Sequence, residues 1–180
     1  YNPFYQVVEN NGGTLVLNRL INRNGRYYMD FEDLEKQFMN GAKMMILCNP
    51  HNPIGRVWSK DELARLVSLC KQYHVFLISD EIHCDIILST NKFTSIGYFI
   101  NQYDQVAVCT APSKTFNIAG LHISNLFIPC PKIKELISKD FCNESLTCPN
   151  LLAITACKAA YTKCDDWLEE QRIHLRNNFL

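Results

Sequence analysis

Three polar side chains of different chemistry each follow an apolar, strand-like run of the sequence. They are an amide, a carboxylate and an amine, carried by Asn52, Asp80 and Lys114. The apolar runs that precede them are residues 44–48, 75–78 and 106–109. Ligands of open α/β sheets bind in the crevice outside the carboxyl ends of the strands, so this repetition predicts that the three side chains share one site.

An amine and a carboxylate placed in this way suit one organic cofactor. A lysine can form a Schiff base with an aldehyde and a carboxylate can pair with a ring nitrogen, which are the protein groups that pyridoxal 5'-phosphate requires. Burying Asp80 alone would cost several kcal/mol, whereas a pyridinium nitrogen would supply a cationic partner. Lys114, once displaced by a substrate amine, would become a base beside the substrate Cα. The residues alone also allow a solvated surface lysine and a carboxylate that caps a helix at a strand end.

Three longer segments make a family resemblance specific. They read CNPHNPIGRVWSKDEL at residues 48–63, ISDEIHCDII at 78–87 and APSKTFNIAGL at 111–121. Together they resemble the class I/II aminotransferase superfamily, fold type I of the pyridoxal phosphate enzymes, and within it the cystathionine β-lyase-like C–S lyases. The resemblance runs over residues 1–180 and implies the central part of a large cofactor-binding domain. It places an N-terminal segment with a glycine-rich phosphate loop, and a C-terminal small domain that grips the substrate carboxylate, outside this chain.

The resemblance assigns roles to the cofactor-binding residues. Lys114 is the catalytic residue that holds the cofactor, and Asp80 pairs with the ring nitrogen. Asn52 donates its amide to the phenolic oxygen of the ring, and Ser113 binds the phosphate. His83 occupies a position where many aminotransferases have a tyrosine that contacts the same oxygen, which agrees with the lyase branch. From the residues alone, Asn52 also fits a turn before a proline and His83 a buried core histidine.

Two further positions bear on how the cofactor is held. Tyr1 aligns with the aromatic residue that stacks on the cofactor ring, although an apolar anchor explains it equally well. His122 stands where many aminotransferases carry an arginine that binds the phosphate. An imidazole would hold a dianion less firmly than a guanidinium, so the resemblance implies weaker retention of the cofactor here.

The resemblance implies a β-lyase that releases pyruvate, ammonia and a thiol from cystathionine, cysteine or related S-substituted amino acids. An aminotransferase is the alternative, because the same residues support both outcomes. A third possibility, of another class, is a catalytically incomplete domain that folds and dimerises without turnover. Active sites of this fold type resemble one another in lying at a dimer interface, so we expect a homodimer. A nicotinamide-binding module is disfavoured, because no GxGxxG segment follows a strand.

Alternating strand and helix patterns predict an α/β fold with a mostly parallel sheet flanked by helices and followed by further helices. Strands are expected at residues 14–17, 44–48, 75–79, 106–110 and 123–128. Helices are expected within residues 1–10 and at 30–37, 59–73, 132–139, 149–162 and 165–180. Ser59 and Glu62 form a capping-box pattern at the start of the third of these helices.

Composition limits the partners and the location of the protein. The 180 residues carry 18 basic and 18 acidic side chains without clustering, so nothing indicates a nucleic acid or membrane partner. No apolar run approaches the roughly 18 residues that span a bilayer. The nine cysteines include no CxxC pair, which indicates reduced thiols, no metal site and a cytoplasmic protein.

Overall fold

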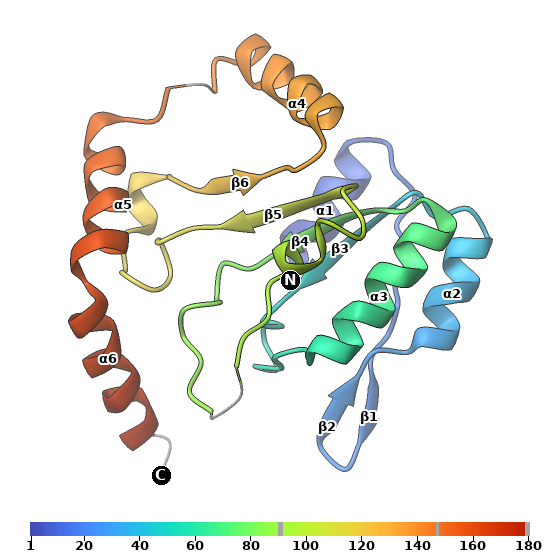
Figure 1. Cartoon of the computed structure of the whole chain (residues 1–180), viewed down its shortest axis with the longest axis horizontal. Helices are drawn as coiled ribbons and strands as arrows, with labels where there is room; N and C mark the ends of the chain where they lie inside the picture. The colour runs from blue at the N-terminus through green and yellow to red at the C-terminus, as the bar shows by residue number, and fades with distance from the viewer. Residues whose placement is uncertain (90–91, 147, 179–180) are drawn as a thin grey trace.

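The computed structural model of the chain describes residues 1–89, 92–146 and 148–178. Its centre is a four-stranded sheet in the order β3-β4-β5-β6 (Figure 1). The strands are β3 (Met44–Cys48), β4 (Phe76–Asp80), β5 (Val106–Thr110) and β6 (Asn125–Phe127). The first three run parallel and β6 runs antiparallel to β5, which confirms the predicted mostly parallel sheet.

Helix α3 (Lys60–Tyr73) connects β3 to β4 and covers one face of the sheet (Figure 1). Its start is fixed by the predicted capping box: the Ser59 hydroxyl accepts from the Glu62 amide, and the Glu62 carboxylate accepts from the Ser59 amide. Helix α2 (Phe31–Met39) packs outside α3, and the side chain of Asp30 caps it through the Asp33 amide. Both helices were predicted, and α2 extends two residues beyond its predicted end.

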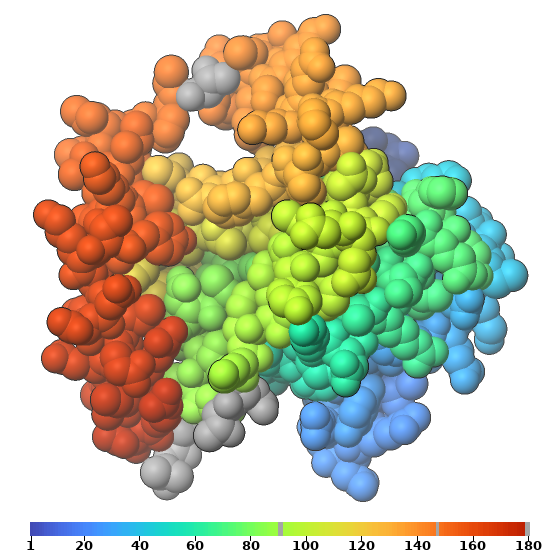
Figure 2. Space-filling model, in the orientation of Figure 1, coloured from blue at the N-terminus to red at the C-terminus, as the bar shows by residue number. Residues whose placement is uncertain are grey.

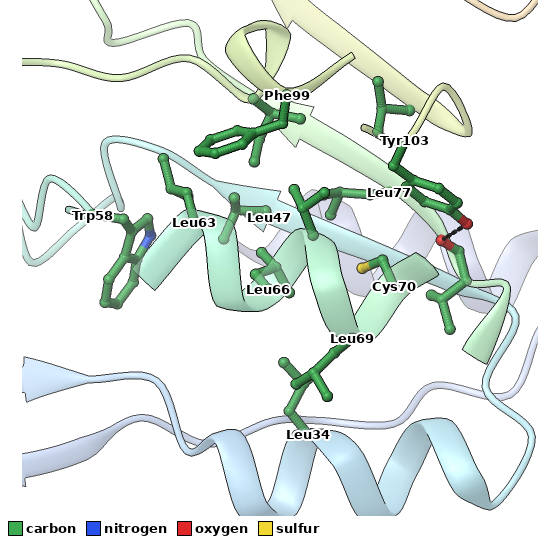
Figure 3. Packing of buried hydrophobic residues seen from close by; sticks show 14 of the residues in the cluster. Leu34, Leu47, Trp58, Leu63, Leu66, Leu69, Cys70, Leu77, Phe99 and Tyr103 are labelled. Atoms are coloured by element: carbon green, nitrogen blue, oxygen red, sulfur yellow. Dashed lines mark hydrogen bonds between the residues drawn. The ribbon is translucent and has the colours of Figure 1, made fainter. Parts of the chain in front are cut away.

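The main core lies between the sheet, α3 and α2 (Figure 3). Leu69 of α3 points toward Leu34 of α2, while Leu63 lies on the side of Phe99 (Figure 3). All four side chains are buried. The hydroxyl of the buried Tyr103 donates to the carbonyl of Val75 at 2.9 Å, so the polar end of this ring is satisfied inside the core. This packing fixes the strands whose ends carry the candidate site.

The N-terminal segment contains one correction to the predicted elements. Helix α1 (Asn2–Asn10) forms as expected, but residues 14–17 are not a strand. An extended segment becomes a strand only when a neighbour pairs with its backbone N–H and C=O groups, and no described strand pairs with these residues. Instead, the predicted turn at residues 22–25 joins a separate hairpin of β1 (Ile21–Arg23) and β2 (Arg26–Tyr28).

Three helices follow the sheet: α4 (Pro131–Asn143), α5 (Leu151–Lys163) and α6 (Asp165–Asn177). Two short 3-10 turns, η1 (Ile96–Phe99) and η2 (Ala119–Leu121), precede β5 and β6. Figure 1 shows α5 and α6 standing beside the end of the sheet to which the β5 arrow points. Figure 2 shows an opening between α4 and the α5 segment. No helix among the described residues is long and apolar enough to cross a membrane.

Candidate active site

The carboxyl ends of the three parallel strands lie at the same level of the sheet. Cys48, Asp80 and Cys109 are in register on β3, β4 and β5. Beyond them, the Asn49 amide donates to the Asp80 carbonyl at 2.9 Å, and the Glu81 amide donates to the Cys109 carbonyl at 2.8 Å. The chain therefore leaves all three strands at one edge, as predicted, and the segments that carry Asn52, Asp80 and Lys114 begin there.

Asp80 is half-buried and has a thiol on each side of it in the sheet. Its Oδ1 accepts a hydrogen bond from the Ile82 amide at 3.1 Å. Within the described ranges it forms no ion pair. Burial raises the pKa of Cys109 to about 11, and the negative charge of Asp80 contributes to the rise. The flanking groups are therefore neutral at physiological pH, and the carboxylate remains available to an external cation.

The loop that carries Asn52 is held by its backbone and by Arg56. His51 and Arg56 form an isolated antiparallel bridge with the His51 amide donating at 2.8 Å. The Arg56 guanidinium binds both carboxylate oxygens of Glu62, and its Nε donates to the Tyr27 carbonyl. The Asn52 amide N–H points to Cys48 Sγ at 3.4 Å, and its side-chain amide bonds to no other described residue. A fixed loop thus presents a free amide donor.

Lys114 lies on a single helical turn that starts just beyond the end of β5. The Phe116 amide donates to the Pro112 carbonyl at 2.9 Å, and the Ile118 amide donates to the Ser113 carbonyl at 3.1 Å. The lysine side chain is exposed, and in the described parts of the chain its amine has no hydrogen-bond or ion-pair partner. Ser113 beside it is half-buried. The turn presents an uncommitted primary amine to solvent.

Tyr1 and His83 have fewer contacts with the rest of the predicted site. Tyr1 is 56% exposed and packs edge-to-face on Phe4, with ring centroids 5.2 Å apart. His83 is half-buried in the turn after β4. Neither side chain bonds to another predicted site residue among those the structure describes.

Three polar residues beside the site were missed. Glu81 is 1% exposed, and Thr115 is 3% exposed directly after Lys114. Asp85 accepts a hydrogen bond from the Thr115 hydroxyl at 3.0 Å. Glu81 and Asp85 belong to the same sequence motif as Asp80, and this is the feature that could have identified them as neighbours of the site. Nothing local to that motif shows which of its carboxylates turns inward.

The donor set fits pyridoxal 5'-phosphate. An amine, a carboxylate and an amide donor follow neighbouring strands, and none of them has a charged or hydrogen-bonding side-chain partner among the described residues. They suit an aldehyde, a ring nitrogen and a phenolic oxygen, respectively. A metal centre fits poorly: the described ranges hold no group of three or more His, Cys, Asp or Glu side chains suited to an ion. The amine, the carboxylate and the amide donor are what give this edge its fit to an organic cofactor.

A groove of about 720 Å³ lies between β5, β6, α4 and residues 93–100, and Glu81, Cys84 and Thr110 line its part next to the strand ends. Its lining is mainly apolar, including Leu126, Phe127 and Phe141, with Glu81 and Lys134 as its charged members. None of the six predicted site residues lines it. We assign the site to the strand ends because the reactive groups lie there.

Known proteins resemble this chain along nearly its whole length. Residues 1–179 match the family described as aminotransferase class I and II. The chain is 41% identical over 180 residues to the cystathionine beta-lyase PatB of Bacillus subtilis, and 33% identical over 184 residues to the protein MalY of Escherichia coli. Each alignment covers 99% of this chain and 46% of the relative.

A solved structure shares the fold. The PLP-bound C–S lyase from Staphylococcus hominis superimposes with a TM-score of 0.94 at 38% identity, over 99% of this chain and 45% of that one. The chain thus spans about half the length of the relatives that it matches. Because the family match extends over nearly every residue, the chain belongs to the aminotransferase class I and II family.

Proposed function

We propose that the protein is a pyridoxal 5'-phosphate-dependent C–S β-lyase for cystathionine, cysteine and related S-substituted amino acids. One observation carries the proposal. Lys114 and Asp80 follow adjacent strands, and among the described residues the amine has no partner and the carboxylate has no cation. The identity of 41% to a cystathionine beta-lyase supports the choice of reaction.

Each residue would have a distinct task. When bound, the cofactor would supply an electron-withdrawing ring that stabilises negative charge on the substrate Cα. Asp80 would hold the ring nitrogen protonated, and Asn52 would donate to the phenolic oxygen. Lys114 would take the proton from Cα through its amine. Loss of a thiolate from Cβ would then leave products that hydrolyse to pyruvate and ammonia.

Three further placements belong to the same proposal. Ser113 would bind the phosphate, His83 would lie near the phenolic oxygen, and Tyr1 would stack on the ring. Tyr1 is exposed, so its ring is accessible to a bound cofactor. Removing any of the three should weaken cofactor binding more than it changes the chemical step.

An aminotransferase is the second candidate. It is favoured by a match of 32% identity over 60% of the chain to the human kynurenine--oxoglutarate transaminase 3. The two reactions share proton removal from Cα and diverge after that step. A lyase needs only a leaving group on Cβ, whereas a transaminase needs a keto acid to complete its cycle.

We propose that residues 1–180 form part of the large cofactor-binding domain of a cytoplasmic homodimer. The coverage of 46% of the relative PatB supports this. The small domain and part of the phosphate site would then lie in other segments of the full-length protein. The 180-residue chain alone should accordingly show little or no turnover.

The deciding experiment gives cystathionine to the full-length protein loaded with cofactor, with and without 2-oxoglutarate. The proposal expects pyruvate and a thiol in both cases. Lys114→Ala should abolish them, while Lys132→Ala, at an exposed position of α4, should not. A new amino acid that forms only with 2-oxoglutarate, without pyruvate or thiol, would identify an aminotransferase.

Borohydride reduction followed by peptide mapping tests the assignment of the lysine independently. The cofactor mass should appear on the peptide that contains Lys114. If it appears on another lysine, or on none, the proposed site is wrong whichever reaction occurs.

A further inference from the structure

Lys114 and the residue after it face in opposite directions. Lys114 is exposed, whereas Thr115 is buried with 3% of its surface accessible. The Thr115 hydroxyl donates to Asp85 Oδ2 at 3.0 Å. The inward-facing threonine thus ties the turn that presents the amine to the loop that follows Asp80 and β4.

Asp85 is itself held from the other side by helix α6. Arg172 donates to the Asp85 carbonyl from Nε at 2.9 Å and from Nη2 at 2.7 Å. Arg172 also forms an ion pair with Glu169, one turn earlier on α6, at 3.2 Å. The backbone of Asp85 therefore has two donors from one rigid guanidinium, and its carboxylate remains free to accept from Thr115.

Phe116 adds an apolar contact between the same turn and the same helices. Its ring lies 5.6 Å from Trp167 of α6 and 6.2 Å from Tyr161 of α5, measured between centroids. The two residues after Lys114 are thus both anchored, one by a hydrogen bond and one by aromatic packing. Lys114 projects from a turn that has little freedom to move.

We propose that Thr115 and Asp85 are positioning residues, which set the place of the Lys114 amine relative to the Asp80 carboxylate. Asp85 lies five residues beyond Asp80, and Thr115 one residue beyond Lys114. Their hydrogen bond fixes the two loops to one another, and Arg172 fixes the pair to α6. Both residues would act through Lys114 and would need no contact of their own with substrate or cofactor. The inference rests on the proposed function, which makes Lys114 the reactive amine.

Small displacements of a reactive group can be costly. A misplacement of about 1 Å can lower a rate about 100-fold without abolishing binding. A threonine that only stabilises the fold would not discriminate between binding and turnover in this way. The expected signature is therefore a fall in kcat at nearly constant KM, together with an altered orientation of the bound cofactor.

The test compares Thr115→Val with Thr115→Ser in the full-length holoenzyme. Valine keeps the shape and removes the hydroxyl, so kcat should fall about 10- to 100-fold with KM within about threefold. The visible circular dichroism of the bound cofactor should change, because it reports how the ring is held. Serine keeps the donor and should restore both properties. Thr155→Val removes a comparable hydroxyl bond on exposed α5 and should change neither.

Variants of Asp85 and Arg172 provide a second test of the proposal if Thr115→Val fails to fold. Asp85→Asn keeps an acceptor for the hydroxyl and should be mild, while Asp85→Leu should reproduce the loss. Arg172→Lys cannot supply both donors to the carbonyl and should give an intermediate effect. Arg176→Lys, which loses an exposed bond to the Leu88 carbonyl and alters a 3.8 Å ion pair with Glu169, is its matched control.

The outcomes separate the two proposals. If Thr115→Val and Asp85→Leu retain wild-type kcat and circular dichroism, the positioning role is wrong even if Lys114 carries the cofactor. If kcat and KM change together and serine does not rescue them, the residues are only structural. If borohydride mapping places the cofactor elsewhere than Lys114, it is the proposed function that fails.

Discussion

Glu81 accepts a hydrogen bond from the backbone amide of Ile96 at 2.8 Å, through its Oε1. The Ser79 hydroxyl donates to the same oxygen at 2.9 Å. This carboxylate, next to Asp80 in sequence, thus joins the end of β4 to the start of η1 inside the protein. Burying an ionised carboxylate at this position costs more free energy than burying an apolar or neutral side chain would.

Glu81 should make the stability of the protein depend on pH. Burial raises the pKa of Glu81 from its usual 4.5, and the charge of Asp80 raises it further. Hydrogen bonds from Ser95, Ile96 and Ser79 lower it, but the net shift of the pKa is upward. The folded protein therefore holds this proton more tightly than the unfolded chain. The resulting stabilisation is complete below about pH 4.5 and is lost as the pH rises through the folded pKa.

The measurement is urea unfolding across this pH range for wild type and Glu81→Gln. The variant stays neutral at all pH values. Its free energy of unfolding minus that of the wild type should therefore increase as the pH rises. Glu32→Gln, on the exposed face of α2, serves as the control. A difference between wild type and Glu81→Gln that stays constant with pH would contradict the prediction.

Asp80→Asn should separate cofactor binding from turnover in the full-length protein. The amide oxygen can still accept from the Ile82 amide, so the local fold should persist. A neutral amide cannot hold a ring nitrogen protonated, so turnover should fall about 100-fold or more. Single-turnover absorbance measurements would locate the loss at removal of the Cα proton. Asp104→Asn, at an exposed position before β5, should behave as wild type, and near-normal turnover in Asp80→Asn would remove Asp80 from the site.

The thiol of Cys109 should resist alkylation at neutral pH. Its pKa is raised to about 11 by burial and by the charges of Asp80 and Glu81, so at pH 8 only about one in a thousand molecules carries the thiolate there. Iodoacetamide labelling followed by mass spectrometry should modify the exposed Cys142 first. Labelling of Cys109 should accelerate as the pH rises, and labelling at the rate of Cys142 at pH 8 would show that the thiol is not shielded in this way.

The sequence predicts those parts of the fold that local patterns determine. Residues 44–48 and 106–110 are strands with the predicted bounds, and Ser59 begins α3 as its capping box indicates. Residues 14–17 look like a strand but lack a pairing neighbour among the described strands, and pairing is a tertiary property.

The same distinction applies to the site. The motifs identify Lys114, Asp80 and Asn52, because apolar strands directly precede each polar cluster. The link from Thr115 to Asp85 spans 30 residues, and Arg172 reaches the same loop across 87. No spacing rule predicts such contacts, because they depend on how α6 packs against the strand ends.

Glu62 should contribute more to the free energy of unfolding than Ser59, although both belong to one capping box. Glu62 accepts from the Ser59 amide at 2.7 Å and from Arg56 Nη2 at 2.7 and 2.9 Å. Ser59→Ala should cost about 1 kcal/mol of the free energy of unfolding, the usual value for a lost N-cap. Glu62→Ala should cost about 3 kcal/mol, because it also leaves a largely buried guanidinium without its carboxylate.

The two variants should also differ in cofactor binding. Arg56 bridges to His51 through its backbone and so holds the loop that presents Asn52. Ser59→Ala leaves Arg56 paired with Glu62, whereas Glu62→Ala releases it and lets the loop move. Fluorescence titration of the full-length apoprotein with cofactor should therefore show weaker binding for Glu62→Ala and near-normal binding for Ser59→Ala. Equal losses in both would mean that the loop depends on the start of α3 as a whole and not on the guanidinium, because the two changes share only the weakened cap.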